Sequence, residues 1–137
     1  MFLTPRQYFR RQGCQPRKRF GQHFLEQTAT AQRIVQSASL TASDVVVEVG
    51  PGLGALTEGL LERAGHVTAV EIDAGFSRYL AERFGDRAGF ALGHGDFLKN
   101  PPAGLFTKIV SNLPYYCSSE MLFSFVRYDA PEVFVML

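Results

Sequence analysis

The fold class of this chain is decided by ten consecutive residues, Val45-Val46-Val47-Glu48-Val49-Gly50-Pro51-Gly52-Leu53-Gly54. The first five form a nearly continuous apolar run, which is typical of a β-strand covered on both faces of a parallel sheet. The glycines that follow allow a tight turn and let a ligand approach the backbone with no Cβ in the way. The next apolar positions have helical spacing: Leu56, Leu60, Leu61 and Ala64. The stretch therefore predicts a strand, a glycine-rich turn and a helix.

Strands and helices alternate along the rest of the chain. We expect further strands at 67–72, 90–92, 108–111 and 133–137. We expect further helices at about 26–39, at 74–84 and from Ser118 or Ser119 onward. This alternation predicts an α/β domain over residues 20–137, with a parallel sheet, right-handed crossovers and flanking helices. Because the sequence stops inside an apolar strand, we expect an N-terminal fragment of a longer domain, truncated after about the fifth strand.

The composition is that of a globular protein with a core of its own. Hydrophobic residues make up 46% and charged residues 20% of the 137 positions, a length sufficient for one domain. No apolar run approaches the roughly 18 residues that span a membrane, so we expect no membrane association. Cys14 and Cys117 are too few for a disulfide framework or a metal site, and we expect free thiols in a reducing, cytoplasmic compartment. The Arg-rich N-terminus leaves an organelle transit peptide open.

The net charge of +1 conceals a basic arm at residues 1–19. Six of the 14 Lys and Arg residues lie within the first 25 positions, which contain no acid, so eight basic residues face 13 acidic ones in the remainder. Such an arm suggests contact with a polyanion, although a solvated tail has the same composition. Interleaved aromatic residues favour nucleic acid, because bases stack on them: Phe2, Tyr8, Phe9 and Phe20.

Two acidic residues follow the predicted strands at the edge where the glycine turn lies. Glu71 comes 21 residues after Gly50 at the end of the next strand, and Asp96 follows the third strand. A carboxylate at the first place can accept from ribose hydroxyls, and one at the second can accept from the amine of adenine. The three features together predict a pocket for an adenosine-bearing cofactor. Gly50, Gly52 and Ala55 also satisfy the dinucleotide pattern, so an NAD-dependent enzyme remains open.

A further candidate site is Asn112-Leu113-Pro114-Tyr115, directly after the predicted fourth strand. Pro114 has no N–H and pushes Leu113 into an extended conformation, which leaves backbone carbonyls free to accept hydrogen bonds. The Asn112 amide adds an acceptor and Tyr115 adds a flat ring, a combination that suits a planar amine such as N6 of adenine. An ordinary strand-to-loop turn is the alternative, since Asn and Pro are common turn residues.

Five motifs occur in order along the chain: 20–25 (FGQHFL), 47–57 (VEVGPGLGALT), 70–73 (VEID), 95–98 (GDFL) and 112–115 (NLPY). Together they strongly resemble the rRNA adenine N6-dimethyltransferases, and within that family the small-subunit branch. The resemblance implies a Rossmann-like methyltransferase fold that uses S-adenosyl-L-methionine. The related erythromycin-resistance methyltransferases of large-subunit rRNA share this layout but more often carry Ile where Leu113 stands.

The resemblance also implies roles for individual residues. The cofactor site would comprise His23, Leu25, Gly50, Gly52, Glu71, Asp96 and Asn112. The catalytic set would comprise Asn112, Leu113, Pro114 and Tyr115, with Tyr115 stacking on the target base. The rRNA contacts would comprise Arg17, Lys18, Arg19 and Tyr115. One departure is that Tyr116 and Cys117 follow the last motif, where the family usually has Asn and a β-branched residue.

We therefore expect an enzyme that adds two methyl groups to N6 of adenosine in the rRNA of a small-subunit precursor during ribosome maturation. It would act as a monomer and without a metal. The alternatives are a large-subunit methyltransferase of the erythromycin-resistance type and a non-catalytic RNA- or DNA-binding factor that retains the fold. Residues 1–137 alone are expected to show little or no catalysis.

Overall fold

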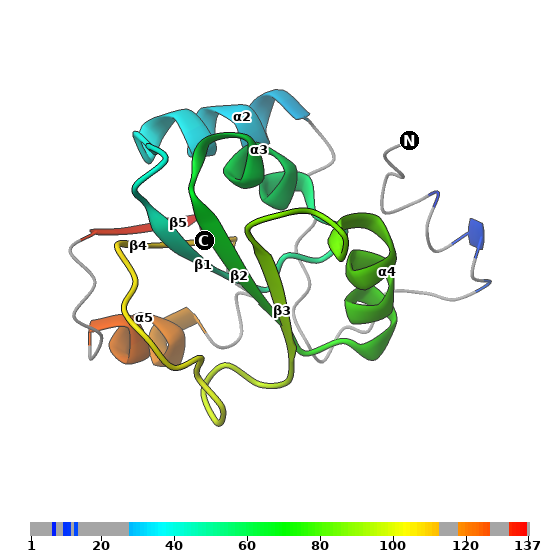
Figure 1. Ribbon diagram of the computed structural model, residues 1–137. Coiled ribbons are helices and arrows are strands. Elements are labelled where there is room, and N and C mark those ends of the chain that lie inside the picture. The colour runs from blue at the N-terminus through cyan, green and yellow to red at the C-terminus, as the bar shows by residue number, and fades with distance from the viewer. Residues whose placement is uncertain are drawn as a thin grey trace.

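Five parallel strands form the centre of the molecule, in the spatial order β3-β2-β1-β4-β5 (Figure 1). The computed structural model describes residues 7, 10, 11, 13, 28–112, 118–126 and 132–136. The strands are β1 (Val45–Val49), β2 (His66–Glu71), β3 (Phe90–His94), β4 (Lys108–Asn112) and β5 (Glu132–Met136). The helices are α2 (Thr28–Ser37), α3 (Ala55–Arg63), α4 (Ala74–Phe84) and α5 (Ser118–Val126). The predicted α/β class with a parallel sheet and flanking helices is confirmed.

Several strand ends differ from the sequence prediction by one or two residues. Strand β3 was expected to end at residue 92 and continues to His94, because Glu71 of β2 pairs with His94. Strand β4 includes Asn112, which pairs with Met136 of β5. Ile72 was assigned to β2 and instead follows it. The strand ends are set by backbone pairing with a neighbouring strand, which a local sequence pattern does not predict.

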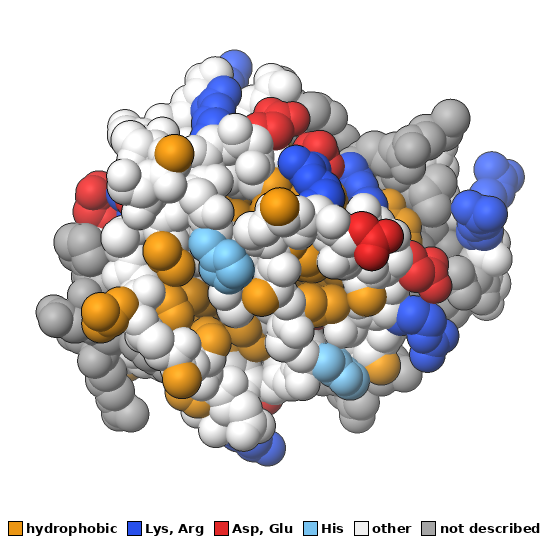
Figure 2. Space-filling view, viewed as in Figure 1, with side chains coloured by type: hydrophobic (Ala, Val, Ile, Leu, Met, Phe, Trp, Pro, Cys, Tyr) orange, Lys and Arg blue, Asp and Glu red, His pale blue; other side chains and the backbone are white. Residues whose placement is uncertain are grey.

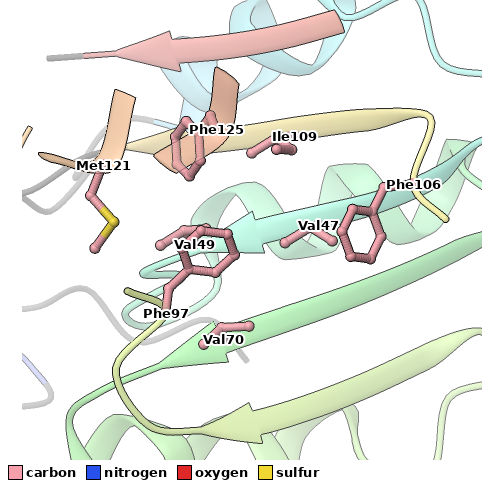
Figure 3. Close-up of a cluster of buried hydrophobic side chains, with 8 residues drawn as sticks. All are labelled: Val47, Val49, Val70, Phe97, Phe106, Ile109, Met121 and Phe125. Carbon is pink, nitrogen blue, oxygen red and sulfur yellow. The ribbon is translucent and has the colours of Figure 1, made fainter. Parts of the chain in front are cut away.

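The core has two parts, one on each face of the sheet. Successive residues of β1 alternate between them, as expected of a strand covered on both sides. Against α2 and α3 lie Ala31, Val35, Ala38, Val46, Leu56, Leu60, Val67 and Val110. On the opposite face, around α5, lie Val47, Val49, Val70, Phe97, Phe106, Ile109, Met121 and Phe125 (Figure 3). Two of these rings, Phe97 and Phe125, meet edge-on with centroids 5.4 Å apart.

The helices pack as their sequence periodicity predicts, as far as their side chains are described. Helix α4 buries Phe76, Leu80 and Phe84, apolar residues that recur every fourth position. Its first turn is capped by Asp73, whose carboxylate accepts from the Phe76 N–H at 3.0 Å. Helix α5 buries Met121 and Phe125, which lie one helical turn apart. No helix within the described ranges is long and apolar enough to cross a bilayer.

A polar network closes the sheet at its amino-terminal edge, away from the predicted site. The Thr107 hydroxyl donates to Asp44 Oδ1 at 2.7 Å and accepts from the Val45 N–H at 2.9 Å. Lys108 is buried and donates to the Ala38 carbonyl at 2.7 Å, at the end of α2, with Asp44 Oδ2 3.5 Å away. Burial alone would raise the pKa of Asp44, but the hydrogen bonds from Thr107 and Thr41 and the nearby Lys108 together lower it.

Replacing Thr107 tests this network. Thr107→Val keeps the shape of the side chain but leaves the Asp44 carboxylate and the Val45 N–H short of a partner. We expect the free energy of unfolding to fall by about 1–3 kcal/mol, measured by denaturant titration at neutral pH. Thr107→Ser keeps the hydroxyl and is the matched control, with a smaller loss. Equal stability of the two variants would show that the hydroxyl contributes nothing.

Candidate functional site

The glycine turn between β1 and α3 has a left-handed backbone at Gly50, Gly52 and Gly54, with φ of 70°, 60° and 85°. A side chain at Gly54 would also lie 2.6 Å from the Phe84 ring of α4. At Gly50, the nearest atom to an added Cβ is the Asn112 carbonyl oxygen, 4.0 Å away. The turn is thus packed closely against α4 at one end, while its first glycine leaves room for a ligand to approach.

Glu71, the last residue of β2, lies against this turn. Its Oε2 accepts from the Gly52 N–H at 3.2 Å and its Oε1 accepts from the Asp73 N–H at 3.4 Å. The side chain is buried, with the residue 3% exposed. Burial raises the pKa of Glu71 to about 7, the two backbone hydrogen bonds oppose the shift, and the charge of Asp73 adds to it. The carboxyl group is therefore poised to ionise near neutral pH.

A cavity of about 170 Å³ lies at the same edge of the sheet. It is lined by Val49, Gly50, Val70, Ile72, Gly95, Asp96, Phe97, Leu98, Glu120 and Met121. Asp96 is held in place because its Oδ1 accepts from the Leu98 N–H at 3.0 Å. Asp96 and Glu120 place carboxyl groups among mostly apolar walls, which suits a flat, partly polar ring that carries an amine.

Asn112 is the last residue of β4, which lies on the opposite side of β1 from β2, and it is buried. Next to it, the Ser111 hydroxyl donates to the Val49 carbonyl at 2.6 Å, which ties the ends of β4 and β1 together. Strand β1 is paired with β2 on one side and with β4 on the other. The chain therefore reverses its winding direction here, and open α/β sheets bind ligands at such switch points.

The structure thus brings five of the predicted site residues to one edge of the sheet. They are Gly50, Gly52, Glu71, Asp96 and Asn112. The other predicted site residues lie outside the described part of the chain: Arg17, Lys18, Arg19, His23, Leu25, Leu113, Pro114 and Tyr115. Within the described ranges, no group of three or more His, Cys, Asp and Glu residues is placed to hold a metal ion.

Sequence reasoning missed the apolar walls of the cavity. Ile72 directly follows Glu71, and Phe97 and Leu98 directly follow Asp96. Their positions next to Glu71 and Asp96 could have identified them, because residues that follow the strand ends lie at the same edge of the sheet as the two acidic residues. Met121 belongs to the core cluster and also lines the cavity.

A second buried carboxyl group, Glu48, supports the turn from the α3 side. It lies in the middle of an apolar strand, is 1% exposed, and accepts from the Thr57 hydroxyl at 2.6 Å. Burial raises the pKa of Glu48 to about 8, the hydrogen bond from Thr57 opposes the shift, and the charge of Glu71 adds to it. At neutral pH this group is therefore mainly an uncharged acid that links β1 to the first turn of α3.

Comparison with known proteins yields a consistent set of relatives. Residues 13–137 match the family model described as ribosomal RNA adenine dimethylase. The ribosomal RNA small subunit methyltransferase A of Dehalococcoides mccartyi is 43% identical over 127 residues, which cover 88% of this chain and 44% of that protein. The 23S rRNA methyltransferase ErmE has a similar crystal structure, with a TM-score of 0.70, 33% identity, and coverage of 81% of this chain and 45% of that one.

A dimethyladenosine transferase from Plasmodium falciparum is similar at a TM-score of 0.71 and 27% identity, over 81% of this chain and 40% of that one. The chain spans less than half the length of the curated relatives it matches. These likenesses confirm both the Rossmann-like methyltransferase fold and the resemblance that the five motifs indicate. The chain belongs to the ribosomal RNA adenine dimethylase family.

Proposed function

We propose that this chain carries the S-adenosylmethionine site and the catalytic asparagine of an enzyme that dimethylates N6 of adenosine in small-subunit rRNA. The observation that carries the proposal is the convergence of the glycine turn, Glu71, Asp96 and Asn112 at one edge of the sheet. The 43% identity to a small-subunit methyltransferase exceeds the 33% identity to ErmE, which favours the small-subunit substrate over the large-subunit alternative.

The residues at this edge fit the proposed cofactor. Glu71 presents a buried carboxyl group that gains from hydroxyl donors and from a nearby positive charge, because its ionised form is poorly solvated. Asp96 offers an acceptor for the adenine amine beside the apolar residues Ile72 and Leu98. Gly50 leaves the turn open on the cavity side. The cofactor would supply a methyl group activated by a sulfonium centre.

Asn112 is placed to prepare the amine that receives the methyl group. The lone pair of adenine N6 is delocalised into the ring, so the amine is a poor nucleophile. We propose that Asn112 Oδ1 and the carbonyls of the Leu113-Pro114 segment accept the N6 hydrogens, which directs the lone pair at the methyl carbon. The rate enhancement then comes from positioning and electrostatics, with no general base of shifted pKa.

The partner would be the rRNA of a small-subunit precursor. We propose that the basic arm at residues 1–19 precedes the methyltransferase domain of residues 20–137, and that Arg17, Lys18 and Arg19 contact the phosphate backbone. The target adenine must leave its stack to reach Asn112, and stacking on Tyr115 would offset part of that cost. His23 and Leu25 would close the cofactor site from the N-terminal side.

Gly50→Ala tests how closely the cofactor approaches the turn. In the free protein the added methyl group has space, so the cost is mainly that of a left-handed backbone, about 1–2 kcal/mol. The same methyl group would occupy the opening toward the cavity. We expect calorimetry to show at least about tenfold weaker S-adenosylmethionine binding while the protein stays folded. Unchanged affinity would mean that no ligand lies against Gly50.

The pH dependence of cofactor binding tests Glu71. The carboxyl group of the free site is neutral below about pH 7 and ionised above it. Because the ionised form would accept from hydroxyl groups, affinity should rise with pH, by about fivefold between pH 6 and pH 7 for one linked proton with a pKa of about 7. Glu71→Gln keeps the size of the side chain and should bind more weakly with little pH dependence in this window. A wild-type affinity that is flat with pH would contradict the role.

Asn112→Ala, in the protein expressed from its complete gene, tests the catalytic role. We expect methyl incorporation into rRNA adenine to fall by at least about 100-fold, because the acceptor for the N6 hydrogens is lost. S-adenosylmethionine binding should change only a few fold. Wild-type turnover in this variant would refute the assignment. An unmodified protein that binds RNA and S-adenosylmethionine but transfers no methyl group would instead indicate a non-catalytic factor, and binding of NAD alone would indicate a dehydrogenase.

A further inference from the structure

A charged cluster joins α4 to α3 behind the glycine turn, outside the cavity. Glu58 of α3 pairs with Arg83 Nη2 at 3.4 Å and with Arg87 Nη1 at 3.0 Å. Basic and acidic side chains are intermixed on the surface around these two helices (Figure 2). None of these groups takes part in the proposed reaction, so we consider which parts of the structure they hold in place.

Arg83 also reaches the glycine turn. Its Nη1 donates to the Leu53 carbonyl oxygen at 3.1 Å, while its Nη2 pairs with Glu58. One guanidinium therefore bridges the turn and α3, and its side chain is 19% exposed against 38% for Arg87. Within the described part of the chain, the Arg87 side chain pairs with Glu58 alone. The two arginines thus share an acidic partner, but Arg83 alone of the two contacts the turn, and its guanidinium also lies over the Phe84 ring, 4.6 Å from the ring centroid.

The turn needs such support because glycine has access to many backbone conformations, so a turn with three glycines does not hold one shape by itself. Three of its five residues are left-handed. Helix α4 backs it at two further points: the buried Leu53 side chain clusters with Phe76, and Gly54 lies against the Phe84 ring. Arg83 adds a hydrogen bond to the backbone itself, from a charged donor that is mostly shielded from water.

We propose that Arg83 is a positioning residue for the cofactor, which holds the Leu53 carbonyl and so keeps the turn at Gly50–Gly54 in its ligand-binding shape. The proposal rests on the proposed function of that turn. Asn112 lies on β4 and has a backbone fixed by strand pairing, so the methyl-transfer step does not depend on Arg83. Loss of Arg83 should therefore act on cofactor binding and leave turnover at saturating cofactor nearly unchanged.

The experiment compares Arg83→Met and Arg87→Met in the protein expressed from its complete gene. Both changes keep an unbranched stem and remove one ion pair with Glu58, but only the first removes the bond to Leu53. Calorimetry gives the dissociation constant of S-adenosylmethionine, and methyl incorporation into rRNA gives KM and kcat. We expect Arg83→Met to raise both the dissociation constant and KM by about tenfold, equivalent to about 1.4 kcal/mol, with kcat within about twofold. Arg87→Met should stay within about twofold of wild type in all three.

A double variant, Glu58→Gln with Arg87→Met, covers the case in which Arg83→Met does not fold. It removes both ion pairs and keeps the bond from Arg83 to Leu53, so its affinity should remain within about twofold of wild type. A loss of affinity in this variant, or equal losses in the two single arginine variants, would overturn the proposal in favour of general stabilisation. Wild-type affinity in Arg83→Met would also overturn it. A wild-type protein that does not bind S-adenosylmethionine would instead overturn the proposed function of the site.

Discussion

The candidate site depends on the conformation of one turn, the glycine turn that leaves β1. Three of its five residues are glycines with a left-handed backbone, and because glycine is conformationally free, neighbouring elements have to hold the turn in one shape. Strand β2 supplies two such contacts, because the Val70 carbonyl accepts from the Gly50 N–H at 2.9 Å and Glu71 accepts from the Gly52 N–H at 3.2 Å. Helix α4 supplies the wall behind it. The first glycine stays open to the cavity only because the rest of the turn is fixed from β2 and α4.

Two buried carboxyl groups on adjacent strands near this turn, those of Glu48 and Glu71, have different roles. Glu48 points toward α3 and keeps its proton at neutral pH, and its Oε2 accepts a hydrogen bond from the Thr57 hydroxyl. Glu71 reaches the turn and ionises near pH 7, so it is the group that responds to hydrogen-bond donors or to positive charge. The charge of Glu71 raises the cost of ionising Glu48, because like charges in a poorly solvated region repel. A cationic ligand with hydroxyl groups would stabilise the ionised form of Glu71, which is a physical reason for this edge to favour one.

The sequence was sufficient to predict the α/β class, all five described strands, the bounds of α4 and the five site residues that converge. Those features follow from local patterns: apolar runs, helical spacing and polar residues placed after strands. It was not sufficient for contacts between distant side chains. Lys108 looks like an ordinary strand start, yet it is buried against the end of α2, 70 positions earlier. The bond from Arg83 to Leu53 likewise spans 30 positions and depends on how α4 packs, which no periodicity reports.

The placement of Asn112 in the strand, rather than in the loop after it, matters for the chemistry. Its backbone pairs with Met136 of β5, and the preceding residue is bound to Val49 of β1, so the sheet holds it from both sides. A side-chain amide has no charge to tune, and its contribution to a transition state depends on being held at the right place before the substrate arrives. Strand pairing provides that rigidity for the proposed catalytic residue, while the proposed cofactor side of the site is shaped by the glycine turn. The two halves meet where the backbone of Gly50 faces the Asn112 carbonyl, so displacement of β4 relative to β1 would alter both cofactor approach and amine positioning at once.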